Sequence, residues 1–203
     1  MITIIDLDLC NLGSVLNMLK KIGKSVTVLS SAEDLKVAKK IILPGVGSFD
    51  NAMKNLNESG LKELLIERVI TDKVPILGIC LGMQLLTNGS EEGHESGLGF
   101  IDAQTIKFQS DTMKIPHMGW NSVTKKKSHA LIDNLEEDAR FYFVHSYYVK
   151  CENPTDTLTT TNYICEFDSA IQKDNVMGVQ FHPEKSHQFG MQLMKNFAEL
   201  ADA

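Results

Sequence analysis

Cys80 lies in a segment whose residue types suit a nucleophile presented on a sharp turn. Val74-Pro75 introduces an apolar run that ends in Gly78-Ile79-Cys80-Leu81-Gly82, and a helical pattern begins at Met83. This is the strand, turn and helix of a nucleophile elbow, with cysteine in place of serine. Glycines two residues before and after the cysteine lack a Cβ, so the strand and the helix can approach closely. Cys80 is therefore a candidate nucleophile, and a buried structural cysteine is the alternative.

A cysteine nucleophile needs a base, and the base needs a group that orients it. His182 has the best setting of the six histidines, because it ends the strand pattern of residues 176–181. Pro183 favours an extended conformation for the residue before it. In an extended segment residues i and i+2 share a side, so Glu184 can lie beside the imidazole of His182. A surface turn carrying ordinary polar residues fits this spacing equally well.

The segment Pro44-Gly45-Val46-Gly47 also follows a strand pattern, in residues 40–43. In a parallel sheet this segment and Cys80 would both emerge at the carboxyl edge, where ligands bind. Glycines there could turn backbone N–H groups toward an oxyanion that develops in acyl transfer. The segment fails as a dinucleotide-binding fingerprint, because G-x-x-G does not follow. A simple turn is the alternative.

The elements that must position these residues alternate between strands and helices in the first ninety residues. Strand patterns cover residues 2–6, 25–29, 40–43 and 74–80, and helical patterns cover 15–22, a short stretch after 31 and 61–70. This alternation predicts βαβ units and a parallel sheet. Short strand patterns follow at 103–108, 141–144, 147–150, 157–161, 169–172 and 176–180, and an amphipathic helix closes the chain at 189–200. We expect one α/β domain over residues 1–203.

Composition excludes several classes of function. The net charge is −6 and no basic block stands out beyond Lys125–Lys127, which argues against nucleic acid or an anionic membrane as the main partner. The four cysteines are scattered, so neither a zinc site nor a disulfide framework is indicated. Since there is no signal-peptide pattern and no run long enough to cross a bilayer, we expect a cytoplasmic protein.

Taken together, these segments resemble the class I (triad-type) glutamine amidotransferases. The resemblance is closest to the glutaminase subunits of imidazole glycerol phosphate synthase, an enzyme of histidine biosynthesis. The matching segments are residues 43–49, 78–86, 116–121, 142–147 and 180–186, in the family order. The fold implied is a single α/β domain with a mostly parallel central sheet flanked by helices and added antiparallel strands in the C-terminal half.

The resemblance implies an enzyme that hydrolyses L-glutamine to glutamate and ammonia through a cysteine thioester, without a metal or cofactor. Cys80 would attack the side-chain amide. His182 would take the thiol proton and then protonate the departing ammonia, while Glu184 holds His182. Backbone N–H groups of Val46 and Leu81 would stabilise the oxyanion.

The resemblance also implies binding residues and a partner. Residues that match positions holding the substrate glutamine are Gly47, Gln84, Ser146 and Tyr147. Residues that match the interface or gate toward the partner are Asn11, Trp120, Tyr142 and Lys185. The implied partner is a (β/α)₈ cyclase subunit in a heterodimer, which uses the channelled ammonia to make imidazole glycerol phosphate and AICAR.

One segment departs from the family pattern. The family begins with D-Y-G-x-G-N, whereas this chain has Asp6-Leu7-Asp8-Leu9-Cys10-Asn11. Because this loop faces the synthase in the family, the ammonia acceptor stays open. The alternatives are a paralogous glutaminase that serves a surface-carbohydrate amidotransferase, a stand-alone γ-glutamyl peptidase and a non-catalytic interaction module. The intact Cys80, His182 and Glu184 argue against the last of these.

Overall fold

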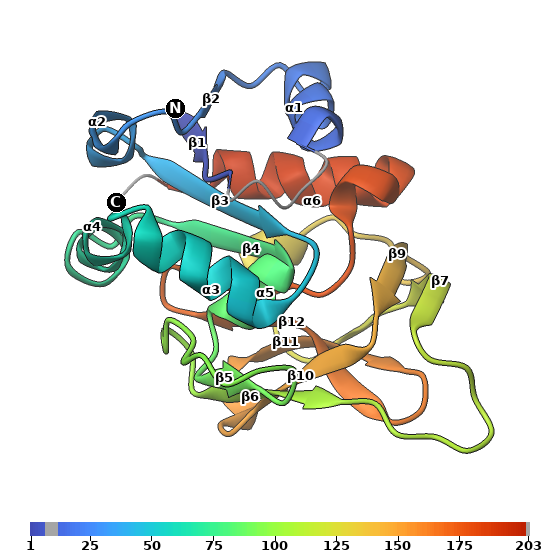
Figure 1. The fold of residues 1–203 in the computed structure, drawn as a ribbon. Coiled ribbons are helices and arrows are strands. Elements are labelled where there is room, and N and C mark those ends of the chain that lie inside the picture. Colours follow the sequence, from blue (N-terminus) through green and yellow to red (C-terminus); the bar gives the residue numbers. More distant parts are fainter. Residues whose placement is uncertain (7–11, 202–203) are drawn as a thin grey trace.

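The computed structural model describes residues 1–6 and 12–201, and eleven strands of this part form one large sheet (Figure 1). In spatial order the strands are β2 (Val26–Val28), β1 (Ile2–Ile4), β3 (Lys40–Gly45), β4 (Ile76–Cys80), β13 (Val176–Val179), β12 (Glu166–Lys173), β10 (Tyr147–Cys151), β6 (Ala103–Lys107) and β5 (Gly89–Ser90), with β11 (Thr157–Asn162) on β12 and β8 (Thr124–Lys125) on β11. A separate antiparallel ribbon pairs β7 (His117–Ser122) with β9 (Arg140–His145).

The direction of the strands changes at β13. All neighbours from β2 to β13 are parallel, whereas β13 pairs with β12, and β12 with β10, in antiparallel fashion. The expected fold, a mostly parallel central sheet with antiparallel strands in the C-terminal half, is confirmed. The register of β3 and β4 sets Gly45 opposite Cys80. The two segments singled out in the sequence therefore end side by side at the carboxyl edge of the sheet.

Helices cover both faces of the parallel strands. They are α1 (Leu12–Lys21), α2 (Ala32–Lys36), α3 (Phe49–Glu58), α4 (Lys62–Ile66), which runs into a π-helical turn at Glu67–Thr71, α5 (Leu81–Leu85) and α6 (His187–Glu199). Buried side chains of α1 and α6 pack with Ile42, and those of α2 to α5 pack with Ile41 and Leu43. Successive residues of β3 thus enter opposite layers, which explains its continuous apolar run. Within the described ranges, no helix has the length and apolar character to span a membrane.

Besides the two-residue strands β5 and β8, two longer elements, α3 and β7, are not predicted by the sequence patterns. Helix α3 buries Phe49, Ala52, Met53 and Leu56 at helical spacing, but its other positions include several asparagines, which are weak helix formers. Strand β7 has a central glycine at positive φ and buries only its first residue, His117, so it lacks an alternating apolar pattern. Pairing with β9 forms this strand, and this pairing is a tertiary contact.

The close approach of α5 to the sheet depends on two glycines. A Cβ on Gly78 would lie 2.5 Å from the carbonyl oxygen of Gly82, and a Cβ on Gly82 would overlap the carbonyl oxygen of Leu43. Both obstacles are backbone atoms, which cannot move aside as a flexible side chain does. The expectation that glycines on both sides of Cys80 allow close packing is confirmed.

We expect Gly82→Ala to lower the free energy of unfolding by more than about 3 kcal/mol, because α5 must move away from β3. Gly89→Ala is the matched control, since a Cβ there would meet only the Gln104 side chain at 3.7 Å. The control should change stability by less than about 1 kcal/mol. Urea unfolding followed by circular dichroism measures both. Equal stability of the two variants would contradict the packing argument.

Candidate active site

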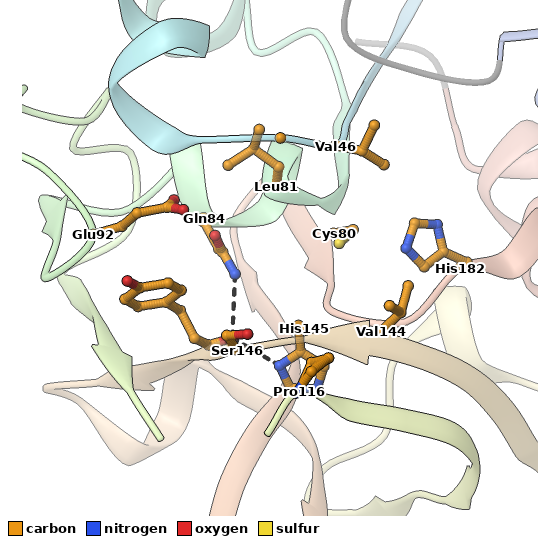
Figure 2. Close-up of a pocket in the computed structure, with 12 residues that line it drawn as sticks. Val46, Cys80, Leu81, Gln84, Glu92, Pro116, Val144, His145, Ser146 and His182 are labelled. Atoms are coloured by element: carbon orange, nitrogen blue, oxygen red, sulfur yellow. Dashed lines mark hydrogen bonds between the residues drawn. The ribbon is translucent and has the colours of Figure 1, made fainter. Parts of the chain in front are cut away.

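Cys80 is held in a strained backbone conformation where β4 meets α5. Its φ of 55° and ψ of −111° lie outside the regions that residues with a Cβ favour. Such a conformation costs about 1–3 kcal/mol and persists only when the surroundings enforce it. Here the surroundings are the parallel strand β3 and the tightly packed glycines of the turn. The side chain of Cys80 is thereby directed away from the strand and into a cavity (Figure 2).

A cavity of about 330 Å³ opens above Cys80 at this edge of the sheet. This volume lies at the lower end of the range for small-molecule sites. Its lining comprises Val46, Gly47, Cys80, Leu81, Gln84, Glu92, Pro116, Val144, His145, Ser146, Tyr147 and His182. Figure 2 shows Cys80 between His182 on one side and Gln84 and Glu92 on the other. Eight of the residues predicted from the sequence therefore surround one cavity.

His182 and Glu184 form the predicted contact, but through a different local conformation. His182 Nδ1 and Glu184 Oε1 are 2.8 Å apart and both side chains are buried. His182 is extended, whereas Pro183–Lys185 forms a 3₁₀ turn and not the extended segment expected. Two backbone groups of His182 are also held, since its N–H donates to the Tyr142 carbonyl at 2.9 Å and its carbonyl accepts the Ser186 hydroxyl at 2.6 Å.

The second ring nitrogen of His182 faces the cavity. Nε2 is buried without a hydrogen-bond partner, and Cys80 lines the same cavity. Burial acts to lower the pKa of His182, but its interactions with Cys80 and with the carboxylate of Glu184 raise that pKa to about 10. The imidazole therefore holds a proton at neutral pH. A proton carried at Nε2 can be delivered to a group bound in the cavity.

Two further histidines form a chain of hydrogen bonds whose direction is defined. His145 Nδ1 lies 2.7 Å from the Tyr147 carbonyl, which can only accept, so this nitrogen donates. Burial lowers the pKa of His145 to about 3 and that of His117 to about 4, so both rings are neutral. His145 Nε2 then accepts from His117 Nδ1 at 2.9 Å, and His117 Nε2 accepts from the Asn121 amide at 3.2 Å. Both rings use all their nitrogens, as expected of structural histidines.

Glu92 lines the cavity but belongs to a charged, glycine-rich loop, residues 91–99, in which the sequence analysis finds no site residue. Its Oε2 accepts the N–H of Phe49 at 2.8 Å. The Asp50 carboxylate in turn accepts the N–H groups of His94 and Glu95. These contacts attach the loop to the start of α3, which the sequence analysis does not predict. Pro116, Val144 and His145 also line the cavity without having been predicted, and no local pattern marks their approach.

The predicted partner residues within the described ranges lie together on the β7–β9 ribbon and the turn after His182. Trp120 is 45% exposed and stacks on His187, with ring centres 5.3 Å apart. Its ring also meets the edge of Tyr142 at 6.3 Å, and Lys185 Nζ lies 5.8 Å from the centre of the Tyr142 ring. We call these four residues the Trp120 patch. The fourth predicted partner residue, Asn11, lies outside the described residues.

Sequence comparison places this architecture among known proteins. The family model "Glutamine amidotransferase class-I" matches residues 3–200. The chain is 57% identical over 202 residues to imidazole glycerol phosphate synthase subunit HisH 2 of Methanococcus maripaludis, covering 99% of this chain and all of the relative. It is 50% identical over 201 residues to the protein of the same name from Pseudomonas aeruginosa, covering 98% of this chain and all of that relative.

Solved structures agree on the fold. A glutamine amidotransferase crystal structure is 18% identical with a TM-score of 0.75, covering 98% of this chain and 97% of the other. A glutamine amidotransferase from Thermotoga maritima is 18% identical with a TM-score of 0.63, covering 98% of this chain and 80% of the other. The chain therefore belongs to the class I glutamine amidotransferase family, and within it to the proteins named imidazole glycerol phosphate synthase subunit HisH.

Proposed function

We propose that this chain is the glutaminase subunit of an imidazole glycerol phosphate synthase and hydrolyses L-glutamine to glutamate and ammonia. One observation carries the proposal: a strained Cys80 and the Glu184-bound His182 meet at a single cavity of about 330 Å³. The full-length relatives named as subunits of that synthase support the assignment. We further propose that residues 1–203 act as one domain in the cytoplasm.

At the start of the proposed reaction the thiol proton of Cys80 is already on His182 Nε2, which leaves a thiolate beside an imidazolium. The thiolate attacks the side-chain amide carbon of glutamine and forms a tetrahedral intermediate. His182 then donates its proton to the amide nitrogen, and ammonia leaves as the C–N bond breaks. Water adds to the resulting thioester with His182 as base, which releases glutamate and restores Cys80. Glu184 keeps the ring orientation and stabilises the imidazolium in both halves.

Backbone N–H groups at Val46 and Leu81 are proposed to bind the oxyanion. Leu81 is the first residue of α5, so its N–H has no partner within the helix. Val46 and Gly47 also line the cavity, and Gly47 has a φ of 103°, which glycine adopts without strain. Donors that are already directed at a developing oxyanion are the largest stabilising contribution in acyl transfer.

The polar lining suits a free amino acid. The Gln84 amide nitrogen donates to the Tyr147 carbonyl at 3.3 Å, which leaves its oxygen to accept from the substrate. Glu92 carries a carboxylate on the same side, and a carboxylate pairs well with an α-ammonium group. We propose that Gln84, Glu92, Gly47 and the segment Ser146–Tyr147 hold glutamine with its amide toward Cys80.

The proposed partner is a (β/α)₈ cyclase subunit that binds the Trp120 patch in a heterodimer. Trp120 is exposed and Tyr142 is partly exposed beside it, and tryptophan and tyrosine are among the residue types that dominate binding energy in interfaces. The patch adjoins the active site, because the Tyr142 carbonyl accepts the backbone N–H of His182 at 2.9 Å. Ammonia would pass from this site to the cyclase, which makes imidazole glycerol phosphate and AICAR.

Glutamate release in the presence of a histidine-pathway cyclase and its nucleotide substrate tests the function. We expect stimulation of the wild-type chain. Cys80→Ala should lose at least about 10³-fold of the activity, because Cys80 is the only thiol among the described residues that line the cavity. Cys165→Ser is the control: it changes a thiol that does not line the cavity and should keep full activity.

Either of two results would contradict part of the proposal. Unchanged turnover in Cys80→Ala would remove Cys80 as the nucleophile. A wild-type chain that hydrolyses glutamine but does not respond to the cyclase would assign the ammonia to a different synthase, and full activity without any partner would favour a stand-alone enzyme.

Glu184→Gln should lower the pKa of His182 from about 10, because the neutral amide no longer stabilises the imidazolium. The protonated fraction of His182 at alkaline pH should fall accordingly. NMR titration of the His182 ring measures the midpoint in both proteins. An unchanged midpoint would show that Glu184 does not set the charge of His182.

Trp120→Ala should weaken binding of the cyclase subunit by about 2 kcal/mol or more, which is roughly a 30-fold rise in Kd. Val37→Ala is the control, since Val37 is a 59% exposed apolar residue at the end of α2, on the opposite side of the molecule from β7 (Figure 1). Isothermal titration calorimetry gives both constants. Equal affinities would exclude the Trp120 patch as the interface.

A further inference from the structure

Gln180 is a buried amide that contacts the sulfur of Cys80. It follows β13 directly, is 0% exposed and donates its backbone N–H to the Ser169 carbonyl at 2.9 Å. Its side-chain Nε2 lies 3.7 Å from Cys80 Sγ. Its Oε1 lies 3.1 Å from Gln84 Nε2. Gln180 does not line the cavity, so a role in holding the substrate does not explain this side chain.

The direction of these hydrogen bonds is determined by a backbone group. The Tyr147 carbonyl can only accept, so the side of Gln84 that faces it must be the NH₂ group. The same NH₂ group lies against Gln180, so the oxygen of the Gln180 amide must face Gln84. The NH₂ group of Gln180 is then directed at Cys80 Sγ. Turning Gln84 around would set its oxygen against the Tyr147 carbonyl, and turning Gln180 around would set its NH₂ group against the NH₂ group of Gln84.

A second hydrogen bond fixes the Tyr147 carbonyl, where this series of hydrogen bonds begins. The Tyr147 carbonyl also accepts the Nδ1–H of the neutral His145 at 2.7 Å, so both of its lone pairs are used. Gln180 is fully buried and Gln84 is 5% exposed, so water has little access to the hydrogen bond between them. Because buried polar groups are costly to leave unpaired, the whole arrangement is stabilised as a unit.

A hydrogen-bond donor directed at Sγ favours the thiolate form of Cys80. A thiolate is a much stronger acceptor than a thiol, so an N–H group directed at sulfur stabilises the anion. The ionisable side chains that share the cavity lining with Cys80 are His182, with Glu184 behind it, and Glu92, His145 and Tyr147. His182 acts from the side of the cavity, whereas Gln180 acts from the protein interior.

We propose that Gln180 is a catalytic residue that donates its side-chain amide to Cys80 Sγ, oriented through Gln84 by the Tyr147 carbonyl, and that it stabilises and positions the attacking thiolate. The inference rests on the proposed role of Cys80 as the nucleophile. It also gives Gln84 a second role. Besides facing the substrate, Gln84 orients the Gln180 amide that donates to Cys80.

The test is the pH dependence of Cys80 alkylation by iodoacetamide, which needs neither glutamine nor a partner. Peptide mapping by mass spectrometry separates Cys80 from the other cysteines. Gln180→Met keeps the volume and removes the donor, and Gln180→Glu keeps the shape and replaces NH₂ by oxygen. We expect the midpoint of alkylation to rise by about one pH unit in Gln180→Met, with a roughly tenfold lower rate at neutral pH, and by more in Gln180→Glu.

Thr159→Val is the matched control, because it removes a buried hydrogen bond, to the Ser169 hydroxyl at 2.9 Å, that does not involve Cys80. Its midpoint should equal that of the wild type. An alkylation midpoint equal to that of the wild type in either folded Gln180 variant would overturn the inference. If Gln180→Met does not fold, Gln180→Glu alone tests it. A wild-type chain in which Cys80 reacts no faster than Cys165 would instead overturn the proposed nucleophile, and with it the inference.

Discussion

Helix α5 begins directly against the carboxyl ends of β3 and β4, and this contact determines the geometry of the rest of the site. It is possible only because Gly78 and Gly82 present no Cβ to the facing backbone. The chain has to turn from strand to helix within one residue, and that residue, Cys80, takes a positive φ. The strain is balanced by the two apolar layers around β3 and β4. Core packing thus holds the proposed nucleophile toward the cavity.

Buried polar groups then complete the site around the Tyr147 carbonyl. This single acceptor receives Nδ1–H from His145 and an amide N–H from Gln84. One chain of hydrogen bonds runs from it through His145 of β9 to His117 of β7, and the other runs through Gln84 and Gln180 to Cys80. An acceptor that cannot donate gives both chains a unique direction, so the orientation of every ring and amide in them is defined.

Hydrogen bonds of the Tyr142 backbone connect the active site to the proposed partner surface. The Tyr142 carbonyl accepts the His182 N–H, and the Tyr142 N–H donates to the Ser186 hydroxyl at 3.0 Å. Tyr142 belongs to the same ribbon as Trp120, so a protein bound to the Trp120 patch would contact the element that holds His182. This connection gives a physical route by which a partner could influence the charge and position of the proposed base.

The sequence by itself determined the residues whose chemistry is local. Apolar runs that end in glycine-bordered turns predicted β3, β4 and the turn at Cys80, because strand periodicity and the absence of a Cβ act over a few residues. The pair of His182 and Glu184 was also predicted, although a 3₁₀ turn and not an extended segment brings the two side chains together. The tertiary structure alone decided the contributions of Glu92, His145 and Gln180. Their contacts join residues far apart in the chain, and no local pattern encodes which buried polar groups will meet once the layers pack.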